Sequence, residues 1–123
     1  LAMDADNAAA LNALGYSLTN HTDRYEEAQR LIERALALAP DDAAIIDSLG
    51  WVLYRRGQHQ RAIVELRRAA ELLPDPEVAA HLGEVLWVVG ERQQARSVWE
   101  EALERFPDDR LIRETMRRLQ ADS

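Results

Sequence analysis

Histidines and paired carboxylates are the residues of this sequence whose types could support catalysis or metal binding. None of the three histidines, His21, His59 and His81, has a second ligand at metal-site spacing. We therefore interpret them as solvated or hydrogen-bonded side chains. The pairs Asp41-Asp42 and Asp108-Asp109 each follow a proline and precede a helical pattern, which predicts helix caps and not acid/base groups.

Other signatures of enzyme or cofactor chemistry are missing from the sequence. It has no glycine-rich phosphate loop, no nucleophile elbow and no cysteine. The net charge of -7 argues against a general binder of nucleic acid or anionic membranes, which would need a positive surface. The longest apolar stretch, residues 85–89, is far too short to span a membrane. We expect no catalytic, cofactor or metal site.

A skeleton of small residues recurs three times along the chain. Each copy has a Leu-Gly pair, an alanine twelve or thirteen residues after the glycine, a second alanine seven residues later and a proline five beyond that. The prolines stand 34 and 33 residues apart, a period that predicts stacked helix-turn-helix units. The copies are Leu14-Gly15, Ala28, Ala35 and Pro40; Leu49-Gly50, Ala62, Ala69 and Pro74; and Leu82-Gly83, Ala95, Ala102 and Pro107.

The three glycines lie inside helical patterns, where glycine costs roughly 1 kcal/mol relative to alanine. A tight helix crossing would offset that cost. We therefore predict that the first helix of each unit meets its partner at the glycine, and that the partner presents Ala28, Ala62 or Ala95 there.

This motif, in register three times over nearly the whole chain, resembles the tetratricopeptide repeat (TPR). The resemblance implies an all-α fold, namely a right-handed superhelix, or α-solenoid, of antiparallel helix pairs with a C-terminal capping helix. We expect residues 1–7 to be a remnant of a preceding repeat, so that the chain is cut from a longer protein. The expected repeats are residues 8–42, 43–75 and 76–109, followed by a capping helix and C-terminus at 110–123.

Local signals predict where the helices begin, end and pack. We expect helices at about 8–20, 24–38, 43–56 and 59–73, then a third pair, and a last helix at about 109–120. Their packing faces are expected to include Leu14, Leu38, Leu72 and Trp99. The expected caps are Asp6 or Asn7, an Asp23–Glu26 capping box, Asp41 or Asp42, Asp75 before Pro76, and Gly57 at a C-terminus.

The opposite face of the first helices carries large aromatic and polar side chains. In TPR proteins this face lines the concave side of the superhelix and commonly receives an extended peptide or a partner helix. We expect the aromatic rings to act as platforms in such a groove, although some of them could instead pack between repeats. The candidate partner-binding residues are Asn12, Tyr16, Asn20, Asp47, Trp51, Tyr54, Arg55, Glu84 and Trp87.

A finer resemblance concerns residues 11–16, 47–55 and 74–87, which look like the C-terminal repeats of long TPR lipoproteins of Gram-negative bacteria. Such proteins are periplasmic and tethered to the outer membrane, and at least one is similar to an adaptor for a C-terminal processing protease. The resemblance implies a scaffold that binds such a protease or its substrates. A cytoplasmic location remains the alternative. A basic carboxylate clamp for chaperone tails is not recognisable, because the groove carries Asp47 and Glu84 and the chain has no lysine.

Two interpretations of function remain open at this point. In the first, the chain is a protein-interaction scaffold that binds a partner in the concave groove, as part of a longer adaptor. In the second, it is a structural terminus or self-association module, and partners bind elsewhere. Open apolar surface near Leu11 and Leu18 would favour self-association.

Overall fold

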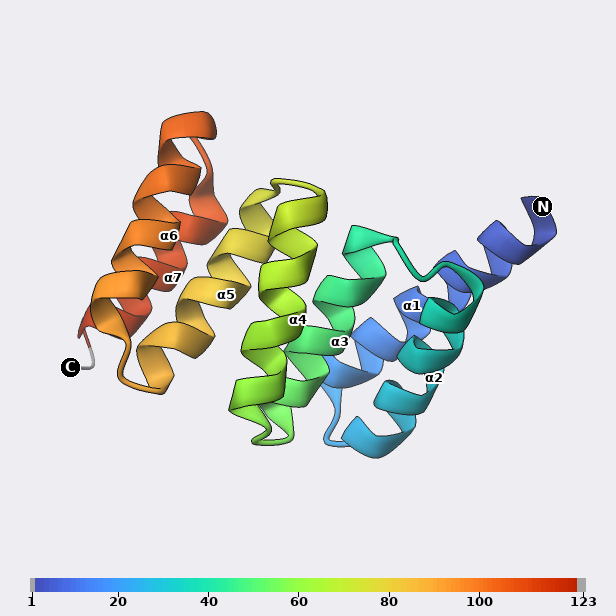
Figure 1. The fold of residues 1–123 in the computed structure, drawn as a ribbon. Helices are drawn as coiled ribbons and strands as arrows, with labels where there is room; N and C mark the ends of the chain where they lie inside the picture. The colour runs from blue at the N-terminus through green and yellow to red at the C-terminus, as the bar shows by residue number, and fades with distance from the viewer. Residues whose placement is uncertain (1, 122–123) are drawn as a thin grey trace.

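The chain folds into α-helices that stack in pairs from one end to the other. The computed structural model describes residues 2–121, with side chains from residue 6 onward. This range contains no strand, and its seven helices are α1 (Ala2–His21), α2 (Tyr25–Leu38), α3 (Ala43–Arg55), α4 (His59–Leu72), α5 (Pro76–Val88), α6 (Arg92–Arg105) and α7 (Arg110–Ala121). Figure 1 shows the pairs α1–α2, α3–α4 and α5–α6 one after another, with α7 closing the stack at the end opposite α1. The predicted all-α solenoid is confirmed.

The predicted close crossing at the glycines is confirmed, but the side chain met at each glycine is not that of the expected alanine. A Cβ placed on Gly15 would lie 2.6 Å from Cγ1 of Ile32 and 3.0 Å from the carbonyl oxygen of Ala28. At Gly50 the corresponding contact would be 2.6 Å from Cγ of Leu66. At Gly83 the added carbon would meet the indole of Trp99. In each pair the glycine therefore packs against a large side chain, which lies one helical turn after the first alanine of the repeat. That side chain leaves no room for even a methyl group on the glycine.

Some of the expected helix ends are confirmed and others are wrong. Asp42 caps α3 by accepting hydrogen bonds from the backbone N–H groups of Ala44 and Ile45, and Asp75 caps α5 with Pro76 in its first turn. Gly57 ends α3 with a φ of 83°, which favours glycine. The Asp23–Glu26 capping box does not form, because α2 begins at Tyr25 without a side-chain cap.

The first helix is longer than expected. We predicted a helix from about residue 8 with Asp6 or Asn7 as its cap, but α1 is continuous from Ala2. Both polar residues therefore lie inside the helix and are exposed.

The core runs through the whole stack. Ile32, Leu66, Trp99 and Ile112 are fully buried in one continuous cluster that draws on every helix pair and on α7. Leu14, Leu38 and Leu72, which we expected to pack, are instead 52%, 44% and 46% exposed. For Leu14 the reason is its place in the stack, because its counterpart Leu49 lies between two helix pairs and Leu14 lies on the first pair.

The last helix continues the pattern of the first helices. As predicted, α7 turns Ile112, Thr115, Met116 and Leu119 inward, and it packs mainly against α5. Asp109 precedes it and accepts a hydrogen bond from the N–H of Ile112. Within residues 2–121, none of the helices combines the length and apolar character that crossing a membrane requires.

Candidate functional site

The first helices of the pairs and α7 lie side by side along one side of the stack, away from α2, α4 and α6 (Figure 1). We call the surface they form the first-helix face. Its accessible or half-buried polar and aromatic side chains are Tyr16, Asn20, Tyr54, Arg55, Glu77 and Arg118.

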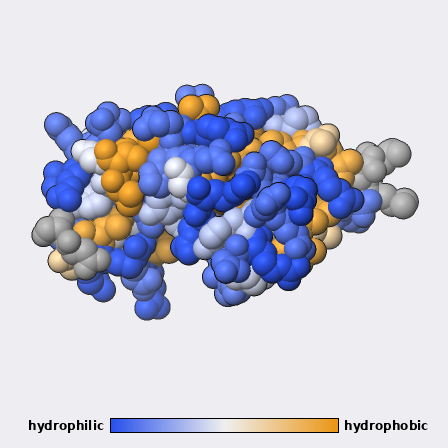
Figure 2. Space-filling model, turned by 90° about the horizontal axis from the view of Figure 1, so that it is seen from below, coloured by the Kyte–Doolittle hydropathy of each residue, from blue (hydrophilic) through white to orange (hydrophobic). Residues whose placement is uncertain are grey.

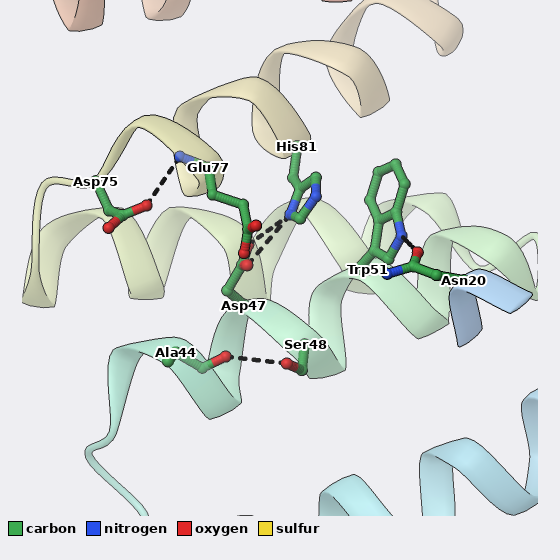
Figure 3. Close-up of polar contacts among 8 residues, drawn as sticks. All are labelled: Asn20, Ala44, Asp47, Ser48, Trp51, Asp75, Glu77 and His81. Atoms are coloured by element: carbon green, nitrogen blue, oxygen red, sulfur yellow. Dashed lines mark hydrogen bonds and ion pairs between the residues drawn. The ribbon is translucent and has the colours of Figure 1, made fainter. Parts of the chain in front are cut away.

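Trp51 is the central aromatic residue of this face, but it is covered by its neighbours. Its indole N–H donates a hydrogen bond to the side-chain oxygen of Asn20 at 3.0 Å, and its ring stacks on the imidazole of His81 with centroids 4.1 Å apart (Figure 3). The residue is 8% exposed. Trp51 therefore joins α1, α3 and α5, which is the packing role that we had weighed against an exposed platform.

Asp47 and His81 form a buried pair between α3 and α5. Nδ1 of His81 lies 3.0 and 3.2 Å from the two carboxylate oxygens of Asp47, and both residues are under a tenth exposed. Figure 3 shows the carboxylate of Glu77 beside them, one helical turn before His81 on α5. Burial raises the pKa of Glu77 above its ordinary value, and the charges of Asp47 and Asp75 raise it further against the opposing effect of His81.

A second polar chain joins α3, α5 and α7. The Tyr54 hydroxyl donates to Glu84 at 2.9 Å, and the Arg118 guanidinium donates to the other oxygen of Glu84 at 2.5 Å. Glu84 is 8% exposed and has little contact with water, and the hydrogen bonds from Tyr54 and Arg118 compensate its charge. Burial, followed by the nearby Glu84 charge, raises the pKa of Tyr54 above its ordinary range, and the hydroxyl therefore stays protonated and able to donate.

The remaining predicted residues of α1 and α3 are more accessible. Arg55 donates to the hydroxyl of Tyr25 at 3.0 Å and lies over its ring. Tyr16 is half-buried, and burial together with the charges of Glu77 and Asp47 raises its pKa to about 12. The side-chain oxygen of Asn12 is buried and has no hydrogen-bond partner among the described residues. Arg55 and Tyr16 can offer hydrogen bonds and aromatic surface to a partner, whereas the buried oxygen of Asn12 cannot.

Trp87 lies apart from the other predicted residues. Its ring packs beside Trp99, with centroids 5.8 Å apart, and the guanidinium groups of Arg92 and Arg96 lie over it at 4.6 and 5.2 Å from its centroid. It is 6% exposed and belongs to the core cluster. The structure therefore places Trp87 between α5 and α6 and not on the first-helix face.

Four residues that build the site were missed from the sequence: Tyr25, Glu77, His81 and Arg118. The signal that could have found two of them is the repeat period itself. Asp47 and His81 are 34 residues apart, and so are Glu84 and Arg118. Residues about one repeat apart lie close to each other on adjacent first helices, so oppositely charged residues at roughly that spacing can be neighbours in space.

The expectation that no histidine has a second metal ligand is wrong for His81. Among the described residues, Asp47, Glu77 and His81 offer three ligand atoms that all lie within 4.8 Å of one another. The second ligand, Asp47, is distant in sequence and close in space, so inspection of local spacing could not find it.

Comparison with known proteins agrees with this architecture. The tetratricopeptide repeat family matches residues 6–75, more than half of the chain. The TPR repeat-containing protein PA4667 of Pseudomonas aeruginosa is 56% identical over 84 residues, which cover 68% of this chain and 14% of that protein. The chain thus spans only a small part of that relative's length.

Solved structures with the same fold have low sequence identity. The Arabidopsis OM64 TPR domain superposes with a TM-score of 0.82 at 12% identity and covers 98% of this chain and 99% of that one. The first TPR of Spaghetti (RPAP3), bound to an HSP90 peptide, gives a TM-score of 0.81 at 15% identity, over 96% and 94% of the two chains. Repeat period, glycine crossings, family match and fold agree, and the chain belongs to the tetratricopeptide repeat family.

Proposed function

We propose that the chain is a protein-interaction module whose partner binds the first-helix face. TPR domains are generally protein-interaction modules, and one structure with this fold has a peptide bound. The observation that carries the proposal is the pair of polar chains that link α1, α3, α5 and α7. They hold Asn20, Tyr54 and Arg118 in fixed orientations before any partner arrives, and preorganised side chains reduce the entropy lost on binding.

The chemistry of the face favours a polar, extended partner. Arg55, Asn20 and Glu77 are exposed donors and acceptors, while Tyr16 and Tyr54 are half-buried rings with polar tips. Such residues supply hydrogen bonds and aromatic contact together, as is typical of binding hot spots. The buried indole of Trp51 contributes by shaping the surface, not by direct contact.

We further propose that this segment serves a longer scaffold. The resemblance to periplasmic, outer-membrane-tethered TPR lipoproteins suggests an adaptor, with a C-terminal processing protease or its substrates as the partner. The matching region of PA4667 is a small part of a much longer protein, which supports a segment within a larger array.

Affinity measurements on matched variants test the binding face. We expect Tyr16→Ala combined with Arg55→Ala to weaken binding of a partner isolated with the longer protein by about 2 kcal/mol or more, because hot-spot truncations have that size. The control is Val64→Ala combined with Arg67→Ala on α4, where both residues are exposed. Equal loss of affinity in both double variants, or loss only in the α4 pair, would place the interaction elsewhere.

A further inference from the structure

We propose that Asp47, Glu77 and His81 form a binding site for a divalent transition-metal cation, with Zn²⁺ as the reference ion. Their ligand atoms lie within 4.8 Å of one another and come from two adjacent helices, α3 and α5 (Figure 3). One imidazole with two carboxylates suits zinc and its first-row neighbours, whereas Mg²⁺ and Ca²⁺ prefer oxygen ligands alone.

The separation of the ligand atoms fits a metal centre. Zinc bonds to imidazole nitrogen and carboxylate oxygen are about 2.0–2.2 Å long, which places neighbouring ligand atoms roughly 2.9–3.5 Å apart. Nδ1 of His81 already lies 3.0 Å from the nearer oxygen of Asp47. Glu77 is exposed as a residue while its carboxyl group is half-buried beside Asp47 and His81, so a side-chain movement of about 1–2 Å completes the set.

The orientation of the imidazole is fixed in advance. Its ring stacks on Trp51 at an interplanar angle of 19°, and Trp51 is in turn held by its hydrogen bond to Asn20. Supported ligands of this kind raise metal affinity because little side-chain freedom is lost on binding. In the neutral ring the cation takes the position of the Nδ1 hydrogen, and the ring's proton then resides on Nε2.

The local charge favours a cation over a neutral ligand. Asp47 and Glu77 together supply two negative charges, which a divalent ion compensates with a neutral imidazole as third ligand. A bound cation also relieves the repulsion between these two neighbouring carboxylates. Glu77 lies at the solvent side of the site and provides the route of entry from the first-helix face.

The test is a titration of the 123-residue chain, without an affinity tag, with Zn²⁺ alone in a non-coordinating buffer. We expect one ion to bind per chain by calorimetry. In nitrogen-detected NMR spectra the side-chain signals of His81 should move, while those of His21 and His59 should not. Titration with Mg²⁺ should leave these signals in place.

Matched variants identify the ligands. Glu77→Gln should weaken Zn²⁺ binding at least about tenfold, because it removes one charged ligand at an exposed position where folding is unaffected. His81→Gln should abolish the binding, with circular dichroism to verify that the helices remain. The controls Glu71→Gln and His21→Gln, both at exposed positions, should bind as the parent does.

Three results would overturn the proposal: no binding of Zn²⁺, undiminished affinity in Glu77→Gln, or movement of His21 or His59 signals in place of those of His81. Any of them would leave Asp47 and His81 as a structural pair that only joins α3 to α5. No partner protein enters the experiment, so its outcome is independent of the proposed interaction function.

Discussion

At the scale of single residues, Trp51 is a packing residue because the neighbouring repeats cover its side chain. Its ring contacts His81 and Tyr54, and its N–H is satisfied by Asn20. The same residue therefore contributes to stability directly and fixes the shape of the first-helix face.

Replacing Trp51 tests this assignment. We expect Trp51→Ala to lower the free energy of unfolding by about 3 kcal/mol, because it removes a large buried ring and leaves a cavity. Trp51→Phe keeps an aromatic ring but loses the hydrogen bond to Asn20 and part of the buried ring volume, so its cost should be smaller, about 1–2 kcal/mol. Urea unfolding monitored by circular dichroism gives both values. A midpoint for Trp51→Ala equal to that of the parent would return the ring to the role of an exposed platform.

The sequence predicted which residues lie on each face of a helix better than it predicted which residues they contact. Helical spacing correctly placed Trp99 on the packing face of its helix, where it is fully buried. It could not show that Trp51 would be covered by His81, because that contact depends on how far α5 is displaced along α3. His81 and Glu77 were missed for the same reason, since their partners lie on another helix.

At the scale of helices, the glycine crossings set the distance between the two members of each pair. Gly50→Leu should lower the free energy of unfolding by more than about 2 kcal/mol despite the better helix propensity of leucine, because its side chain would overlap Leu66. The control is Ala44→Leu, at an exposed position of the same helix. If the two variants unfold at the same urea concentration, α3 and α4 do not need their close approach.

The attachment of α7 is a second property of this scale. Arg118→Met removes the cation that faces Glu84 and should destabilise the chain by about 1 kcal/mol, a modest value because the Arg118 side chain is 55% exposed to screening water. Arg117→Met, one position earlier and also exposed, should change stability by less than about 0.5 kcal/mol. Indistinguishable melting curves for the two variants would mean that α7 is held by its apolar residues alone.

Helix ends were predictable where one residue determines the end, and not where the end depends on the conformation of the preceding residues. Asp42, Asp75 with Pro76, and Gly57 follow from single residues with strong positional preferences, and the structure uses all of them. Asp6 and Asn7 have the same preferences, but α1 continues through them. A capping residue marks a helix start only when the preceding residues leave the helix.

At the scale of the whole molecule, the two ends of the stack differ. The closing end is covered by α7, whereas the end formed by α1 and α2 has a groove of about 520 Å³ lined by apolar and polar side chains: Asn7, Ala10, Leu11, Leu14, Arg34 and Leu38. Figure 2 shows apolar surface beside the grey residues at the right-hand end, where α1 begins. Leu14 is 52% exposed there, while its counterparts Leu49 and Leu82 are 5% and 4% exposed between pairs.

This apolar end should make the isolated chain associate. We expect Leu14→Gln to reduce the association seen by sedimentation velocity at high concentration and to change the free energy of unfolding by less than about 0.5 kcal/mol, because Leu14 is exposed. Val64→Gln is the control, since Val64 is also exposed but lies on α4. A parent chain that stays monomeric, or equal association in both variants, would show that the chain does not self-associate through this end.

The fold was predictable because each weak sequence signal occurs three times, once in every repeat. One glycine in a helix or one proline after it indicates little, but three copies at a nearly constant period predict both the helix pairs and their crossing. The candidate site was only partly predictable, because its side chains meet across repeats. A search for opposite charges about one repeat apart finds Asp47 with His81 and Glu84 with Arg118, both at a separation of 34 residues.

The most direct test of the central claim is photo-crosslinking from defined positions to the partner of the longer protein. A benzophenone amino acid replaces Arg55 on the first-helix face or Val64 on α4, two exposed positions on opposite sides of the same helix pair. We predict that the partner crosslinks from position 55 and not from position 64. Crosslinking from position 64 alone, or equally from both, would contradict binding at the first-helix face.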